Sequence, residues 1–163
     1  LPAAPLYSDT LSVRSGCFVS LTQGGKLRGS IGTIVAKDPL AAAVQRNALA
    51  AALEDKRFKP LTVEDLPSLE IGISVVTPLR KLQYRDGQDL LDQLKPGVHG
   101  VLLTYEASKR ATFLPQVWGQ LPEKTAFLKA LCRKGGIPLD AWQDPAKTTV
   151  EVYESFDFAE KPR

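Results

Sequence analysis

The hydrophobic residues of this chain fall into short runs that turn-forming residues separate. Two such runs, 16–22 (GCFVSLT) and 26–34 (KLRGSIGTI), contain residues that favour β-strands. The QGG between them predicts a hairpin turn, because glycine supplies the positive φ that tight turns need. With a two-residue Gly-Gly loop, Val19 lies opposite Ser30, and Cys17 lies on the same face of the hairpin as Ser30.

The second predicted strand contains two glycines, Gly29 and Gly32, on either side of Ser30. Glycine inside a strand costs backbone entropy and adds no packing. One explanation is that a ligand or another backbone approaches the strand closely at this point. The other is a bulge or a tight contact between a helix and the sheet. The sequence leaves both explanations open.

The pattern LAAAVQRNALAAALED (40–55) predicts a helix that packs closely on a sheet, because bulky residues recur among its alanines. Asp38 suits the N-cap, Pro39 suits the first helical position, and Pro60 prevents continuation. Helical turns are predicted at 62–66, with a capping box of Thr62 and Asp65, and a central strand is predicted at 69–77. The segment 80–86 is polar and has room for a short strand. The remaining predicted elements are a helix at 86–94, strands at 100–106 and 111–114, a helix at 123–136 closed by Gly135, and a final strand at 148–156.

Hairpins and helices follow one another without a regular strand–helix–strand rhythm, which favours an α+β fold. The 163 residues, 1–163, fit a single domain. A hydrophobic content of 44% and a charged content of 24% are typical of soluble proteins, and no apolar run is long enough to cross a membrane. LPAAP at the start has no signal-peptide pattern. Two cysteines and one histidine make the reducing cytosol the default compartment, so we expect a cytoplasmic protein.

The sequence lacks the motifs of common catalytic, cofactor and metal sites. It has no phosphate-binding loop, no G-x-G-x-x-G, no G-x-S-x-G and no zinc-type spacing of Cys17, Cys132 and His99. We therefore expect no cofactor and no metal, and the catalytic residues are unknown. A net charge of +3 disfavours a nucleic-acid partner.

Four segments carry polar groups that a scaffold alone does not require. LRGSIGT has the two glycines discussed above, and EDKRFKPL holds Asp55 and Arg57 either as a structural clamp or as part of a site. ATFLPQVW offers Thr112 and Gln116 beside a proline bend, or forms an ordinary core corner. In LCRKGG, Lys134 either caps helix-end carbonyls or takes part in a reaction.

Together, GCFVSL, LRGSIGT, AAALEDKRFKPLTVEDL, LEIGISVVTP, KPGVHGVLL, ATFLPQVW and FLKALCRKGGIP resemble the AMMECR domain family, whose prokaryotic members are called AmmeMemoRadiSam system protein A. The resemblance runs from about Gly16 to Phe156. It implies an α+β fold, with a larger lobe of mixed or antiparallel sheet flanked by helices and a smaller lobe that also contains a sheet. It implies a further helix before Leu1. The family name implies a shared pathway with a Memo-like protein and a radical SAM enzyme.

The resemblance supplies no defined activity, and two positions depart from the family pattern. The family hexapeptide is Leu-Arg-Gly-Cys-Ile-Gly, whereas this chain has LRGSIG with Ser30 at the cysteine position. Serine has no thiolate near neutral pH, which makes it a poor nucleophile without a base. Cys17 is a candidate for a relocated thiol if it lies near Ser30. His99 stands where an acidic residue is common, so we expect it to be dispensable.

The leading hypothesis is an accessory or binding module with a cleft between its lobes, floored by LRGSIGT, that takes a small anionic ligand or a peptide. Arg28 suits a carboxylate or phosphate because its planar fork matches those anions. One alternative is an enzyme that uses Asp55 as acid or base and Lys134 or Ser30 as nucleophile, and a weaker alternative is an RNA-binding protein. The candidate site residues are Arg28, Gly29, Ser30, Gly32, Asn47, Asp55, Arg57, Thr112, Gln116 and Lys134.

Overall fold

The computed structural model describes residues 9–160 of the chain. These residues form two compact units. Unit 1 contains residues 9–78 together with the segment from Phe156 onward, and unit 2 contains Leu79–Ser155. Each unit has its own four-stranded sheet and its own hydrophobic core. The α+β class predicted from the sequence is confirmed.

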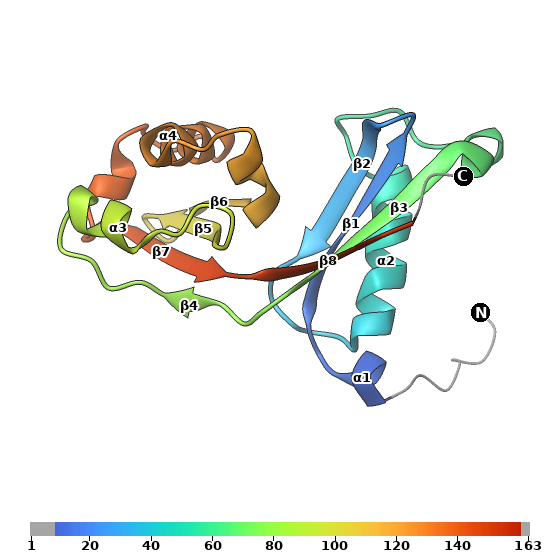
Figure 1. Ribbon diagram of the computed structural model, residues 1–163, viewed down its shortest axis with the longest axis horizontal. Helices are drawn as coiled ribbons and strands as arrows, with labels where there is room; N and C mark the ends of the chain where they lie inside the picture. Colours follow the sequence, from blue (N-terminus) through green and yellow to red (C-terminus); the bar gives the residue numbers. More distant parts are fainter. Residues whose placement is uncertain (1–8, 161–163) are drawn as a thin grey trace. The chain divides into compact units, whose positions relative to one another are not determined.

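Unit 1 is a sheet of strand order β2-β1-β3-β8 with one long helix packed on it (Figure 1). The strands are β1 (Gly16–Gln23), β2 (Lys26–Thr33), β3 (Leu69–Val76) and β8 (Ser155–Ala159). The helices are α1 (Asp9–Ser12), α2 (Leu40–Leu53) and the 3-10 helix η1 (Val63–Ser68). The order places β2 at one edge of the sheet and β8 at the other.

The core of unit 1 lies between α2 and the sheet. Val19 and Leu21 of β1 are buried against Ala51 of α2, and Val44 and Ile73 pack around them. Alanine on the inner face of α2 allows the helix axis to approach the strands more closely than larger side chains would permit. This close approach places the end of α2 directly against β2.

The hairpin of β1 and β2 has a different register from the one predicted. The Gly24–Gly25 loop forms as expected, but the ladder shifts between Leu21 and Thr22, so that Ser20, and not Val19, lies opposite Ser30. Thr22 pairs with Leu27 and Leu21 pairs with Gly29, which leaves Arg28 as the extra residue of a β-bulge. Because side chains alternate along a strand, the shift moves Ser30 to the face opposite Cys17.

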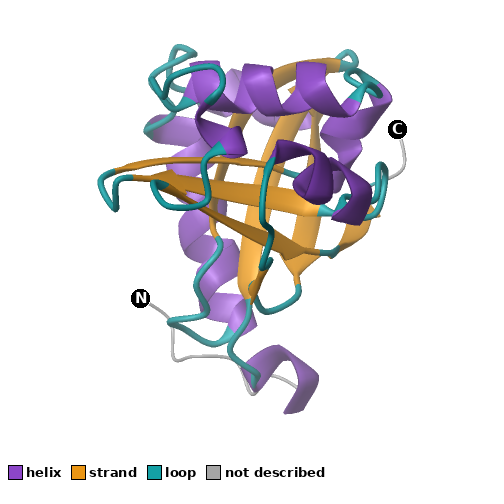
Figure 2. Ribbon diagram, turned by 90° about the vertical axis from the view of Figure 1, so that its left-hand side faces the viewer, coloured by secondary structure: helices purple, strands orange, loops and turns teal. Residues whose placement is uncertain are grey.

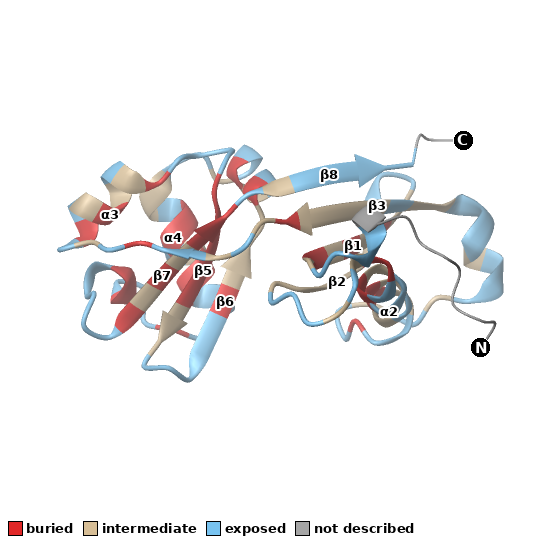
Figure 3. Ribbon diagram, turned by 90° about the horizontal axis from the view of Figure 1, so that it is seen from below, coloured by how far each residue is buried: buried red, intermediate tan, exposed pale blue. Residues whose placement is uncertain are grey.

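Unit 2 is a sheet of order β4-β7-β5-β6 with helices packed on it. Figure 2 colours the helices and strands of both units by type. Its strands are β4 (Arg80–Lys81), β5 (Gly100–Tyr105), β6 (Lys109–Phe113) and β7 (Thr148–Tyr153). Its helices are α3 (Gly87–Gln93), α4 (Lys124–Lys134) and the 3-10 helices η2 (Pro115–Gly119) and η3 (Ala141–Gln143). Figure 3 shows how much of β5 and β7 is buried. Trp118 stacks on Phe127 at 3.6 Å between ring centroids in this core.

Three details of the predicted elements are wrong. The last strand does not run from 148 to 156, because β7 ends at Tyr153 and β8 begins at Ser155 in the other sheet. Pro39 is the N-cap of α2 and Leu40 its first residue, and Asp38 instead pairs with Arg46. The left-handed residue after α4 is Gly136, with φ 60°, rather than Gly135.

The other predicted elements are confirmed within one to three residues, including the bond from the Thr62 N–H to the Asp65 carboxylate, 2.9 Å long, that the capping box predicts. Across residues 9–160, none of the helices combines the length and the apolar character needed to cross a membrane.

Candidate functional site

Asp55 lies where α2 gives way to the loop that follows it. The helix ends at Leu53, and the Asp55 carbonyl accepts the Phe58 N–H at 3.0 Å to close a turn. The carboxylate reaches the edge of β2, where its Oδ2 accepts the Ser30 N–H at 2.9 Å. Only 5% of the Asp55 side chain is exposed, so this charge requires bonded partners inside the protein.

Arg57 supplies most of those partners. Oδ1 of Asp55 accepts the Arg57 backbone N–H at 3.1 Å and Nε at 2.9 Å, and Oδ2 accepts Nη2 at 2.6 Å. These side-chain bonds from Arg57 are the largest cause of a pKa of Asp55 far below its ordinary value. Burial opposes the shift, and the backbone N–H groups of Ser30 and Arg57 add to it. Asp55 is therefore a carboxylate throughout the neutral pH range.

The guanidinium of Arg57 is held in place but not covered. Nη2 also donates to the Ser30 carbonyl at 3.2 Å, and the group lies 5.3 Å from the centre of the Phe58 ring. The side chain of Arg57 is 57% exposed. Nη1 bonds to no residue within the described range 9–160. One edge of a fixed guanidinium therefore faces solvent with two N–H donors.

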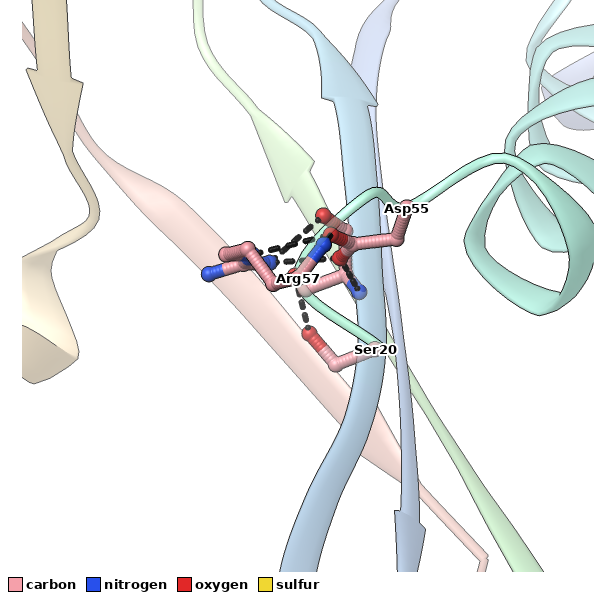
Figure 4. A network of polar contacts seen from close by, with 4 residues as sticks. Ser20, Asp55 and Arg57 are labelled. Carbon is pink, nitrogen blue, oxygen red and sulfur yellow. Dashed lines mark hydrogen bonds and ion pairs between the residues drawn. The ribbon is translucent and has the colours of Figure 1, made fainter. Parts of the chain in front are cut away.

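A pair of serine hydroxyls lies next to this ion pair (Figure 4). The Oγ atoms of Ser20 and Ser30 are 2.9 Å apart, and both residues are half-buried. Two hydroxyls have two protons, and their mutual hydrogen bond uses one, so the second is free for an acceptor. We call Ser20, Ser30, Asp55 and Arg57 the Ser30 cluster.

The two glycines of β2 are explained by packing within unit 1. A Cβ on Gly29 would lie 2.0 Å from the Ala51 carbonyl oxygen of α2, and one on Gly32 would lie 2.2 Å from the Phe18 ring. The space that both glycines leave is thus filled by the chain itself. The expectation that they admit a ligand to the backbone is wrong, and the tight helix–sheet contact is the correct explanation for Gly29.

Asn47 does not lie on the rim of a site as expected. It is 2% exposed, and its Nδ2 donates to the Cys17 carbonyl at 3.0 Å and to Thr33 Oγ1 at 3.3 Å. Its amide therefore fixes α2 to the first two strands. Cys17 is buried on the same side, and burial raises the pKa of its thiol, so Cys17 does not replace the missing thiol beside Ser30.

Arg28 is the bulged residue of β2 and is half-buried. Its charge affects Asp65. The pKa of Asp65 is lowered mainly by a hydrogen bond from the Thr62 N–H, and the positive charge of Arg28 lowers it further. Arg28 therefore has an acidic neighbour of its own chain in the segment that includes η1, whereas the sequence predicted that it contacts the carboxylate or phosphate of a ligand.

Three candidate residues belong to unit 2. Thr112 Oγ1 bonds to the Val101 carbonyl at 2.9 Å and to the Tyr153 hydroxyl at 2.8 Å. Lys134 Nζ donates to the Thr112 carbonyl at 2.8 Å and lies 5.1 Å from the centre of the Phe113 ring. Gln116 is exposed in η2. Lys134 thus ties α4 to β6, and the carbonyl that it bonds belongs to a strand rather than to the end of its own helix.

The sequence identified three members of the Ser30 cluster and missed Ser20. Its signal was present as a small polar residue between Val19 and Leu21, but only the true register shows that it faces Ser30. Burial disfavours the charged forms of two other reactive groups. It raises the pKa of the Cys132 thiol and lowers the pKa of His99, whose Nδ1 accepts the Lys95 N–H. Residues 9–160 contain no group of three metal-ligating side chains.

Unit 1 also has an apolar groove of about 600 Å³ beside α2. Its lining includes Leu40 and Val44 from α2, Ile73 from β3, and Phe156 and Phe158 from β8. The two phenylalanines are 61% and 63% exposed. This surface supplies contact area but little polar chemistry, so it is separate in character from the Ser30 cluster.

Comparison with known proteins assigns the chain to a family. The AMMECR1 family model matches residues 2–158. The chain belongs to the AMMECR1 family. Protein NEQ441 of Nanoarchaeum equitans is 34% identical over 158 residues, which cover 93% of this chain and 84% of that protein. A protein of Methanothermobacter thermautotrophicus is 36% identical over 155 residues, with coverage of 93% and 79%.

The AMMECR1 fold is also present in a solved structure. The uncharacterized protein PH0010 of Pyrococcus horikoshii has a TM-score of 0.91 to this chain at 27% identity, with coverage of 99% of this chain and 81% of that chain. Both compact units therefore lie within one AMMECR1 match, and the resemblance found in the sequence motifs is confirmed.

Proposed function

We propose that this AMMECR1 protein is a binding module whose ligand or partner contacts the Ser30 cluster of unit 1. The proposal rests on the arrangement of hydrogen-bond donors around a carboxylate whose acceptor positions are already occupied. Asp55 accepts four hydrogen bonds and fixes Arg57, so that Arg57 Nη1 and one serine hydroxyl proton remain available. Such a preformed set of donors lowers the entropy lost on binding.

The donors determine the class of group that binds. A ligand here must supply acceptor oxygens, because the one carboxylate of the cluster has no capacity for a further donor of comparable quality. The charges of Asp55 and Arg57 cancel, which favours a single carboxylate or a peptide carbonyl over a multiply charged phosphate. A peptide segment of a partner protein offers both kinds of acceptor.

An enzymatic role for the same residues has less support. A general acid or base works best with a pKa near the operating pH, whereas Arg57 holds the pKa of Asp55 far below its usual range. The Ser30 hydroxyl bonds to the Ser20 hydroxyl, which is not a base, and the neighbouring Asp55 carboxylate already accepts four hydrogen bonds from N–H donors. The chemistry of the cluster is therefore recognition rather than covalent catalysis.

The partners follow from the family resemblance. We propose a Memo-like protein and a radical SAM enzyme of the same organism as the proteins that this module serves. A module that presents hydrogen-bond donors and no nucleophile suits an accessory role in such a system, in which the partners supply the reactive centres.

The test is binding of the purified Memo-like protein and of the radical SAM enzyme to a variant without the hydroxyls. Ser20→Ala with Ser30→Ala removes both members of one hydrogen bond, so no buried group loses its partner and the free energy of unfolding changes by less than about 1 kcal/mol. We expect affinity for at least one of the two proteins to fall about tenfold in titration calorimetry.

Ser108→Ala is the matched control, since it removes an exposed hydroxyl from the turn before β6 in unit 2. Its affinity should equal that of the native protein. If both partners bind the double variant as tightly as the native protein, or bind neither form, the proposed function is wrong.

A further inference from the structure

Strand β2 is eight residues long and lies at the edge of its sheet. An edge strand presents backbone donors and acceptors that have no partner strand, and a long edge is a template for pairing with another chain. At Ser30 these groups point away from β1, since the N–H bonds to Asp55 and the carbonyl bonds to Arg57. Ser30 is thus a position at which a further strand would pair.

The loop after α2 occupies this position with side chains. Asp55 Oδ2 accepts the Ser30 N–H at 2.9 Å, and Arg57 Nη2 donates to the Ser30 carbonyl at 3.2 Å. An acceptor for the N–H and a donor for the carbonyl are the two groups that one residue of an added antiparallel strand provides. The ion pair therefore reproduces the hydrogen bonding of a neighbouring strand at one residue.

We propose that the Asp55–Arg57 pair blocks the free edge of β2 and so prevents this strand from pairing with β2 of a second copy of this chain. The partner is a second copy because a two-fold axis at Ser30 would bring two identical antiparallel edges together, and such an interface is self-complementary. Leu27 and Val35, on either side of Ser30, are 40% and 50% exposed, so pairing would also bury apolar side chains.

Contacts with α2 fix the position of the loop that carries Asp55 and Arg57. Ala51 of α2 lies against Gly29 with no room for a Cβ, and the Leu61 N–H donates to the Ala52 carbonyl at 2.9 Å, which fixes the far end of the loop. The bulge at Arg28 adds a second protection, since bulges disturb the regular edge that another strand needs. Both features hold the loop where it blocks the strand.

The test measures self-association of the whole chain without any ligand. Asp55→Ala with Arg57→Ala frees both backbone groups of Ser30, and we expect the mass from light scattering to rise at least twofold above 17.7 kDa as concentration increases. Hydrogen exchange at the Ser30 amide should be fast in the dilute variant and slow again in the associated form. Association that depends on concentration distinguishes an opened edge from simple loss of stability.

Two further variants make the outcome decisive. Arg57→Ala alone frees the Ser30 carbonyl and removes the Nε and Nη2 donors from Asp55, whose carboxylate keeps the backbone N–H groups of Ser30 and Arg57. This variant should fold with lower stability and associate more weakly than the double variant. Arg85→Ala with Asp89→Ala removes an exposed ion pair of unit 2 and should remain monomeric. A folded Arg57→Ala variant that stays monomeric over the same concentrations overturns the proposal, whether or not the double variant folds.

Discussion

Gly29 shows how a single residue can serve packing while its sequence context suggests a ligand. Glycine beside a polar residue in a strand has two physical causes, close approach of a ligand and close approach of the protein's own backbone. The Ala51 carbonyl of α2 occupies the position where a Gly29 side chain would lie. The cost of glycine in β2 is therefore offset by the contact that places α2, and with it Asp55, against the strand.

Gly29→Ala should lower the free energy of unfolding by about 1 to 3 kcal/mol, because the helix backbone must move to admit the methyl group. Gly72→Ala on β3 is the matched control, since its nearest neighbours would be ordinary contacts at 3.8 and 3.9 Å. Urea unfolding followed by far-ultraviolet circular dichroism compares the two. Equal free energies for the two variants would show that the contact at Gly29 has no special importance.

Asp55 is the residue on which the geometry of the cluster depends. Its pKa is lower in the folded protein than in the unfolded chain, so its ionised form favours folding. That contribution is complete above the ordinary aspartate pKa of about 3.9 and disappears as the pH falls through the lower folded value. The Ser30 cluster should therefore be intact at every pH above the ordinary aspartate value.

At the scale of elements, the hairpin shows what a sequence pattern leaves undetermined. Both strands and the Gly-Gly turn follow from composition, since β-formers flank residues that reach positive φ. The bulge at Arg28 has no such local signal: β1 pairs with β3 without interruption, and the extra residue lies only in β2. That one inserted residue decides that Ser20 faces Ser30.

The end of the chain shows the same limit on a larger element. Val150, Val152 and Phe156 alternate as if in one strand, yet the chain leaves one sheet after Tyr153 and joins the other at Ser155. A period of two residues indicates an extended chain but does not indicate which sheet it joins. Membership in a sheet is a tertiary property, and no residue pattern within the segment specifies it.

The loop after α2 was predictable as a clamp and not as the cap of a strand edge. An acid and an arginine two residues apart at a helix end favour an ion pair, which the structure contains. The bonds to both backbone groups of Ser30 join residues 25 and 27 positions apart in sequence. Such long-range contacts follow from packing of α2 on the sheet, which periodicity alone does not fix.

For the whole molecule, composition and motif order were sufficient for the α+β class and the AMMECR1 family. The division into two units was implied only by the family resemblance. It arises because each unit buries its own apolar residues. Every buried residue of the unit 2 core lies between Leu82 and Val152.

A fragment of residues 79–155 should consequently fold alone. It contains both tryptophans of the chain, Trp118 and Trp142, which are buried in this core. We expect blue-shifted tryptophan emission and one cooperative urea transition for the fragment. Emission typical of solvated tryptophan in buffer without urea would mean that the core of unit 2 requires the rest of the chain.

Asp55 is a bonded carboxylate that organises both Arg57 and the edge of β2. The most direct measurement is an NMR titration of the Asp55 carboxyl carbon in the folded protein, with Arg57→Ala as the comparison. The native protein should titrate well below the ordinary value of about 3.9, and Arg57→Ala should move the midpoint upward toward it. A native midpoint at or above the ordinary value, unchanged by Arg57→Ala, would mean that Arg57 does not hold Asp55 in its ionised form.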